Sequence, residues 1–232
     1  MECPICYEMV QSYDRFETPC NHIFHVDCIS RIIKNTCPMC RRNIVSPFAS
    51  LLDACKNGNL DIINRYKSVE LCRRTGWTDE TPLMMAVEYD RVDAVRELIP
   101  LSDVNFETEG ISSLMISCYN GNAEISEMLA PASNIDKELA YIHKGVQRYV
   151  TPLMMACYIE SVDTVAVMIK YANVGHVTRS GDTALMVAST NGNIPIIRLL
   201  MNNSDIYQIN DEGETAISQA KNADVLWELS KL

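Results

Sequence analysis

Apolar positions recur along most of the chain at intervals close to 32 residues. The recurring residue is aliphatic, and its copies are Leu51, Leu83, Leu114, Leu153, Leu185 and Ile217. The intervals between successive copies are 32, 31, 39, 32 and 32 residues. Nearly the same text surrounds three of them, at residues 81–86 (Thr-Pro-Leu-Met-Met-Ala), 151–156 (Thr-Pro-Leu-Met-Met-Ala) and 183–188 (Thr-Ala-Leu-Met-Val-Ala). Self-similarity at this period predicts a stack of repeated supersecondary units.

Each repeat carries the signals of two helices joined by a turn. The Thr-Pro pair predicts a capped first helix, since Thr accepts a hydrogen bond from the helix start and Pro suits the first turn. A glycine follows seven residues after the aliphatic position, as in Asn120-Gly121-Asn122, and supplies a left-handed residue. A second, amphipathic helix is then expected, for example over residues 194–201. Asp90 and Glu160 occupy the glycine position in two repeats, where a left-handed backbone strains other residues.

A period near 33 with Thr-Pro-Leu opening a helix pair resembles the ankyrin repeat. The resemblance implies an all-α ankyrin-repeat solenoid over residues 48–232, with about six units starting near 48, 76, 108, 146, 178 and 210. The family's usual His after Thr-Pro-Leu is replaced by methionine, so packing must substitute for polar bonds. The 39-residue interval leaves about seven extra residues within 130–149, where we expect a loop or a lengthened helix.

The first forty residues lack this period and concentrate metal-binding side chains instead. Their candidate ligands, in order, are Cys3, Cys6, Cys20, His22, His25, Cys28, Cys37 and Cys40. Eight ligands of this type fill two closed tetrahedral sites, which predicts two structural Zn²⁺ ions. So short a segment cannot hold a fold by its apolar core alone, so metal binding and folding are expected to be one event. Spacing alone allows either sequential or alternating sites.

Two adjacent histidine ligands in the middle of the series resemble the RING-H2 type of zinc finger. The resemblance implies a small cross-braced two-zinc RING domain (ββα) over residues 1–44, joined by a short linker at 45–47 to the repeats. In this family the ligand pairs alternate between the two ions. The first site is then Cys3, Cys6, His25 and Cys28, and the second is Cys20, His22, Cys37 and Cys40.

RING domains of this kind act as ubiquitin-protein ligases that have no catalytic cysteine of their own. By resemblance, Ile5, Ile32 and Pro38 form an apolar platform for a ubiquitin-conjugating enzyme. Arg41, directly after the last ligand, takes the linchpin-like role of orienting the thioester-linked ubiquitin. Ile32 stands where many ligases have Trp, which leaves room for a non-catalytic zinc-binding and ankyrin adaptor or scaffold. A second alternative is a regulator whose repeats bind a signalling complex and whose RING ubiquitinates only itself. RING dimerisation is also left open.

Four cysteines lie beyond the RING segment. Cys55, Cys118 and Cys157 each follow the aligned leucine by four residues, a register that predicts packing on the inner helix and not nucleophilic catalysis. Cys72 falls outside this register and has no histidine nearby in sequence.

A substrate-binding groove is expected on the repeats, because ankyrin arrays usually bind proteins on the concave face of their inner helices. We expect Tyr89, Tyr119 and Tyr158 to occupy matching positions on that face, just before the turn. The loop residues expected to flank them are Trp77, Ile111 and Val150. Amphipathic aromatic side chains on a rigid concave surface are typical binding anchors. The alternative is that these tyrosines only cover neighbouring repeats.

The two parts of the chain differ in net charge. Residues 1–46 hold five basic and five acidic side chains, so the rest carries the whole formal charge of −10. Such a field disfavours nucleic acid and favours a basic or polar protein partner, although it can also serve solubility alone. No apolar run is long enough to span a membrane, and no export signal accompanies the ten cysteines. We therefore expect a cytoplasmic protein, with the nucleus as the alternative. Ile44, Val45 and Phe48 are expected to pack the RING segment against the first repeat.

Overall fold

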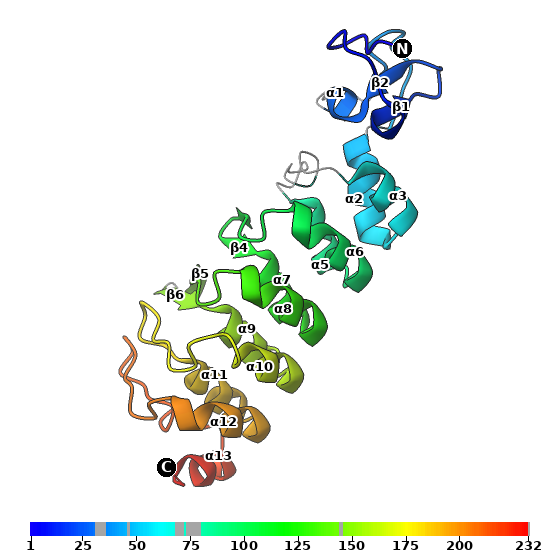
Figure 1. The fold of residues 1–232 in the computed structure, drawn as a ribbon. Helices are drawn as coiled ribbons and strands as arrows, with labels where there is room; N and C mark the ends of the chain where they lie inside the picture. Colours follow the sequence, from blue (N-terminus) through cyan, green and yellow to red (C-terminus); the bar gives the residue numbers. More distant parts are fainter. Residues whose placement is uncertain (31–35, 46, 68–71, 73–79, 144–145, 232) are drawn as a thin grey trace. The chain divides into compact units, whose positions relative to one another are not determined.

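The computed structural model describes residues 1–30, 36–45, 47–67, 72, 80–143 and 146–231. Two compact units make up the chain, Met1–Asp103 and Val104–Leu232 (Figure 1). Ile32 and Trp77, both predicted site residues, lie outside the described residues. Within the described ranges, no helix has the length and apolar character that crossing a membrane requires.

The start of the first unit has the predicted ββα order. Its elements are η1 (Ser12–Asp14), β1 (Arg15–Glu17), β2 (Ile23–His25) and α1 (Val26–Ser30). The strands are antiparallel, with Phe16 opposite Phe24. A carboxylate oxygen of Asp14 accepts a 3.0 Å hydrogen bond from the Val26 amide and fixes the start of the helix. The helix buries Ile29 in a core of few side chains.

Helix pairs make up most of the other described residues of the first unit. They are α2 (Pro47–Asn57) with α3 (Leu60–Tyr66), and α5 (Pro82–Glu88) with α6 (Val92–Leu98), the last followed by η2 (Ile99–Leu101). The RING segment packs on the first pair: Ile44 and Phe48 are buried, and the Phe16 and Tyr66 rings lie 6.2 Å apart. Val45 is exposed, so its expected role in this packing is wrong.

Three further helix pairs build the second unit. They are α7 (Ser113–Asn120) with α8 (Ala123–Leu129), α9 (Pro152–Tyr158) with α10 (Val162–Met168), and α11 (Ala184–Asn191) with α12 (Ile194–Leu200). The shorter elements are β3 (Glu107–Thr108), β4 (Ile111–Ser112), η3 (Ala130–Ala132), η4 (Met201–Asn203) and the last helix, α13 (Ala223–Leu229). Leu114, Leu153 and Leu185 are buried, as their register predicts, and Ile217 lies in turns and not in a helix.

The helix caps follow the sequence pattern. The side chains of Thr81, Ser112, Thr151 and Thr183 each accept a hydrogen bond from the amide three residues later. At the glycine position of the turn, Asp90 and Glu160 have φ values of 55° and 61°, so both are left-handed as predicted.

The extra residues of the 39-residue interval form a β-hairpin. Its strands are β5 (Leu139–His143) and β6 (Val146–Val150), paired antiparallel with Tyr141 opposite Arg148. The expected loop or lengthened helix is therefore wrong. The physical reason lies in the composition, because both runs are rich in β-branched and aromatic residues and a glycine stands between them in the sequence.

Candidate functional site

The eight predicted ligands gather in two clusters within the first unit. One consists of Cys3, Cys6, His25 and Cys28, and the other of Cys20, His22, Cys37 and Cys40. Within each cluster the ligand atoms lie no more than 4.8 Å apart. These are the two sets that the alternating, cross-braced pattern predicts, and each offers the Cys₃His donors of a structural zinc site.

His25 shows that the first cluster has the size of a zinc site. Its Nδ1 lies 3.2 Å from Cys6 Sγ and 3.8 Å from Cys28 Sγ. A tetrahedral Zn²⁺ with usual bond lengths would separate sulfur and nitrogen ligands by roughly 3.5 Å. The other ring nitrogen, Nε2, lies 3.2 Å from the Met9 carbonyl oxygen. The tautomer that donates this hydrogen bond leaves Nδ1 available for the metal.

Thr18 supports the second cluster. His22 Nδ1 lies 3.4 Å from both Cys20 Sγ and Cys37 Sγ, which again matches a tetrahedral ion. The Thr18 hydroxyl accepts a 3.0 Å hydrogen bond from the His22 amide and lies 3.1 Å from Cys20 Sγ. Its hydrogen bond to the sulfur lowers the pKa of Cys20 to about 6, which favours the thiolate that binds metal.

Two thiols of the first cluster have pKa values that are shifted in opposite directions. Burial raises the pKa of Cys28 to about 12, and the hydrogen bond with Cys6 adds to this rise. Burial also acts to raise the pKa of Cys3, but backbone amides of His25 and Cys6 outweigh it and lower the value to about 6. A divalent cation would stabilise all three thiolates together, so the donor set fits Zn²⁺.

The first Cys-x2-Cys pair lies in a tightly bonded turn. The Cys3 amide donates to the Glu8 carbonyl, and the Tyr7 amide donates to the Cys3 carbonyl, both at 2.8 Å. A β-bridge between Glu2 and Met9 closes the turn. Tyr7, directly after the second cysteine, has a left-handed backbone with φ of 63°.

The last Cys-x2-Cys pair has the same construction. The Cys37 amide donates to the Arg42 carbonyl at 2.7 Å, and the Arg41 amide donates to the Cys37 carbonyl at 2.8 Å. A β-bridge joins Thr36 to Asn43. Arg41 has φ of 63°, a strained value that these bonds hold in place. The turn therefore fixes the direction in which the Arg41 side chain leaves the backbone.

The predicted platform residues are available at the surface. Ile5 and Pro38, one in each of these turns, are exposed. Arg41 is exposed as well, and among the described residues it forms no ion pair.

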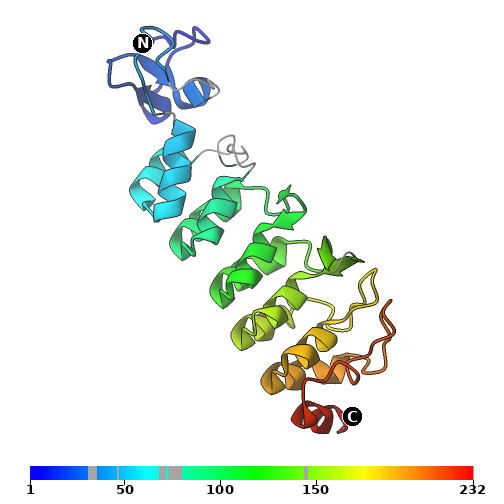
Figure 2. The ribbon, with the colours of Figure 1, turned by 180° about the vertical axis from the view of Figure 1, so that it is seen from behind.

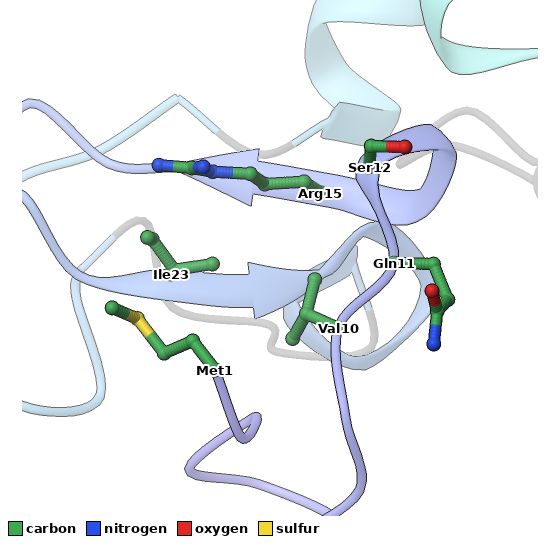
Figure 3. Close-up of a pocket in the computed structure, with 6 residues that line it drawn as sticks. All are labelled: Met1, Val10, Gln11, Ser12, Arg15 and Ile23. Carbon is green, nitrogen blue, oxygen red and sulfur yellow. The ribbon is translucent and has the colours of Figure 1, made fainter.

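A small pocket on the first unit lies apart from these residues. Its lining consists of Met1, Val10, Gln11, Ser12, Arg15 and Ile23 (Figure 3). None of the eight ligands, Ile5, Pro38 or Arg41 contributes to it, and Arg15 is ion-paired with Glu17 at 2.7 Å. The pocket is not part of the candidate site.

The predicted groove residues differ in their register on the helices and in their exposure. Tyr119 and Tyr158 follow their aligned leucines by five residues and are exposed at the ends of α7 and α9. Tyr89 follows Leu83 by six residues and is half-buried, with the Lys56 ammonium 4.9 Å from its ring centre. The expected match of Tyr89 to the other two is therefore wrong by one position. The flanking residues Ile111 and Val150 are half-buried.

The cysteines of the repeats are buried in the core. Burial raises the pKa of Cys55 and of Cys118 to about 12, and burial raises the pKa of Cys157 as well. Cys72 is also fully buried. The thiols of Cys55, Cys118 and Cys157 are therefore protonated and inaccessible, in agreement with the packing role that their register predicts.

Sequence reasoning missed a buried charge on the inserted hairpin. The Arg148 side chain is 8% exposed, and its Nη1 donates to both carboxylate oxygens of Asp182 at 2.8 Å. Its Nη2 is ion-paired with Glu212. The sequence signal is weak, since Arg148 looks like any surface arginine in an insertion and its partners come from two later loops.

Comparisons with known proteins agree with this geometry. The family model "Ankyrin repeats (3 copies)" matches residues 51–141 and 137–212, and the model "Ring finger domain" matches residues 1–41. The crystal structure of the human ASB11 ankyrin repeat domain aligns with a TM-score of 0.65, at 23% identity, over 87% of each chain. That likeness concerns the fold alone.

Two curated relatives match a segment the length of a RING finger. RING-H2 finger protein ATL32 of Arabidopsis thaliana is 38% identical over 50 residues, which are 20% of this chain and 16% of that protein. E3 ubiquitin-protein ligase RNF126 of Xenopus tropicalis is 40% identical over 47 residues, 19% of this chain and 15% of that protein. The chain thus matches less than a fifth of either relative. With its leucine register, capped helix pairs and two Cys₃His clusters, the chain belongs to the ankyrin-repeat family and carries a two-zinc RING finger in residues 1–41.

Proposed function

We propose that the protein is a RING-type ubiquitin ligase whose ankyrin repeats recruit the protein substrate. The RING finger would bind a ubiquitin-conjugating enzyme that carries ubiquitin as a thioester. A lysine amine of the substrate attacks the thioester carbonyl, an isopeptide bond forms, and the enzyme's cysteine leaves as the thiolate. The ligase supplies no bond-forming group, so its contribution is proximity and orientation.

Each part of the RING finger has a distinct task in this proposal. The zinc ions are structural and hold the two Cys-x2-Cys turns in shape. Ile5 and Pro38 contact the conjugating enzyme through their exposed apolar surface. Arg41 bonds ubiquitin and the enzyme together, since a guanidinium offers several donors in a fixed plane.

The observation that carries the proposal is the state of Arg41. It is exposed and forms no ion pair among the described residues, and its backbone, with φ of 63°, donates a hydrogen bond to the Cys37 carbonyl. Strain of this kind collects at functional positions. The likeness of the RING segment to RNF126, named an E3 ubiquitin-protein ligase, supports the same reading.

An in vitro ubiquitination panel tests the proposal. The full chain, loaded with zinc, is assayed with several conjugating enzymes as wild type, Ile5→Ala and Arg41→Ala. Losing a charged hydrogen bond removes about 1.5–3 kcal/mol, so Arg41→Ala is expected to slow transfer by roughly tenfold or more. Arg42→Ala is the matched control for Arg41, and Val45→Ala, another exposed apolar residue, is the control for Ile5; both are expected to keep wild-type rates.

Two results would contradict the proposal. Lack of activity with every conjugating enzyme would favour the non-catalytic adaptor. Activity that neither Ile5→Ala nor Arg41→Ala changes would refute the assigned interface. We further propose the cytoplasm as the place of action, which imaging of the tagged full chain would test.

A further inference from the structure

An exposed aromatic cluster lies on the second unit. It consists of Tyr119 on α7, Tyr158 and Ile159 at the end of α9, and Tyr141 on β5; we call it the tyrosine patch. The three tyrosines are 58%, 66% and 44% exposed in the order Tyr119, Tyr158, Tyr141. Large aromatic side chains that remain this exposed on rigid elements are typical of binding surfaces.

Several contacts bring the members of the patch together. Tyr119 and Tyr158 occupy the same register on α7 and α9, two inner helices that pack against each other. Ile159 Cγ2 lies next to Gly121, at the turn that follows Tyr119. Tyr141 lies on β5, the first strand of the hairpin that leads directly into α9, the helix that ends at Tyr158.

The buried Arg148 fixes Tyr141 in the patch. A two-stranded hairpin is at best marginally stable by itself. Here Arg148, the cross-strand partner of Tyr141, binds Asp182 and Glu212 from the two following loops. Asn210 Nδ2 donates to the same Asp182 carboxylate at 2.8 Å. The hairpin is thereby anchored, and the patch is preorganised.

The second unit as a whole carries an excess of negative charge. Residues 104–232 contain 15 Asp and Glu against 8 Lys and Arg. Of the seven basic side chains described there, six are ion-paired with carboxylates and the seventh, Lys221, donates to the Asn191 carbonyl. The unit therefore has little positive charge to offer a partner.

Two exposed carboxylates flank the inserted hairpin and have no ion-pair partner among the described residues. Glu109 lies in the β3–β4 turn, whose Gly110 is next to the Leu139 side chain of β5. Asp211 lies in the loop whose Glu212 binds Arg148. The β3–β4 turn, the β5–β6 hairpin and the later loops project from the same side of this unit (Figures 1 and 2).

We infer that the tyrosine patch binds a cationic segment of a protein partner, with Lys or Arg side chains between apolar residues. The cations would meet Glu109, Asp211 and the faces of the tyrosine rings, and the apolar residues would cover Ile159. This inference rests on the substrate-recruiting role of the repeats proposed above and names the class of substrate they select.

A displayed library of random peptides tests this inference. Peptides are selected on the zinc-loaded full chain and then measured against Tyr119→Ala/Tyr158→Ala. Because a few aromatic anchors carry most of the affinity of such surfaces, we expect selected peptides rich in Lys or Arg that bind this variant at least about tenfold more weakly. Glu109→Gln/Asp211→Asn is expected to weaken binding several-fold.

Ile142→Ser is the matched control. Ile142 adjoins Tyr141 on β5 but points to the opposite face of the hairpin, and it is 70% exposed. Its variant is expected to bind like wild type. Selection of acidic or uncharged peptides, no selection at all, or equal binding by the double tyrosine variant with its circular dichroism melt unchanged would each overturn the inference.

The outcome is separable from that of the proposed function. Arg41→Ala should bind the selected peptides as wild type does, and the tyrosine variants should retain ubiquitin discharge to free lysine. Peptide binding without discharge would sink the ligase proposal alone. Discharge without cationic peptide binding would sink this inference alone.

Discussion

The RING segment and the repeats are stabilised by different interactions. The RING segment buries few apolar side chains, such as Phe24 and Ile29, and its two Cys-x2-Cys turns are closed by backbone bonds around metal ligands. Within each unit, the described helix pairs of the repeats bury their aligned leucines and draw their stability from packing against their neighbours. The two parts should therefore fail under different treatments, although both lie in one chain of 232 residues.

The largest expected effect is loss of a zinc ligand. Structural zinc contributes an apparent 10–16 kcal/mol, roughly, to small domains, so Cys37→Ser should unfold the RING segment and leave the repeats folded. Zinc content and hydrogen exchange of the full chain measure this. Cys157→Ser makes the same chemical change in the repeats and should keep two zinc ions per chain. A Cys37→Ser protein that retains both ions, or a Cys157→Ser protein that loses them, would break the comparison.

A core substitution in the repeats should have the opposite effect: it should destabilise the repeats and leave the zinc content unchanged. Leu153 is buried, and Leu153→Ala removes contacts and leaves a cavity, which should lower the free energy of unfolding of the repeats by about 2–5 kcal/mol. Urea titration followed by circular dichroism gives this value. Leu153→Met, nearly equal in volume, should lower it by less than about 1.5 kcal/mol. Zinc content should not change in either variant; zinc loss in Leu153→Ala would show that the two parts are not independent.

Loss of a helix cap should have a smaller effect. The Thr151 hydroxyl accepts a hydrogen bond from the Met154 amide at the start of α9, so Thr151→Ala should lower the stability of the repeats by about 1 kcal/mol. Thr151→Ser keeps the acceptor and serves as the control in the same urea titration. Equal losses in both variants would mean that the methyl group, and not the cap, stabilises the helix.

The smallest expected effect is a pH dependence of stability that arises at the last helix, α13. Glu228 accepts hydrogen bonds from Arg198 and Lys231, which lower its pKa to about 2. Because this pKa lies below the value of an unfolded glutamate, the stabilisation is complete above about pH 4.5 and is lost as the pH falls toward 2. Arg198 is largely exposed, so solvent screens the pair and the effect is small.

Glu228→Gln removes this titration. The difference in melting temperature between wild type and Glu228→Gln should shrink between pH 5 and pH 2, while effects common to both proteins cancel. A difference that stays constant with pH would show that the carboxylate charge does not contribute.

The sequence predicts best what depends on local spacing. Leucines at a period near 32 and ligands two residues apart indicate structures within one repeat or one turn, and the structure bears these out. The inserted hairpin could not be predicted with the same security, because a two-stranded hairpin depends on what anchors it. Its anchor is Arg148 with Asp182, a pair 34 residues apart in sequence.

The candidate site also contains residues that local spacing predicts and residues that it does not predict. The ligand sets follow from spacing together with the RING resemblance. The error at Tyr89 is one of register, since Tyr89 follows its leucine by six residues and Tyr119 and Tyr158 follow theirs by five. Tyr141 was missed because its exposure follows from the hairpin and not from the repeat. Whether Ile5 and Pro38 act as one platform remains a prediction for the ubiquitination panel.

The most direct test of the central claim follows the discharge of thioester-linked ubiquitin from a conjugating enzyme to free lysine, in a single turnover with the zinc-loaded chain. We predict that wild type and Arg42→Ala accelerate discharge equally and that Arg41→Ala is slower by roughly tenfold or more. Equal acceleration by wild type and Arg41→Ala, or no acceleration by wild type with any conjugating enzyme tested, would contradict the account.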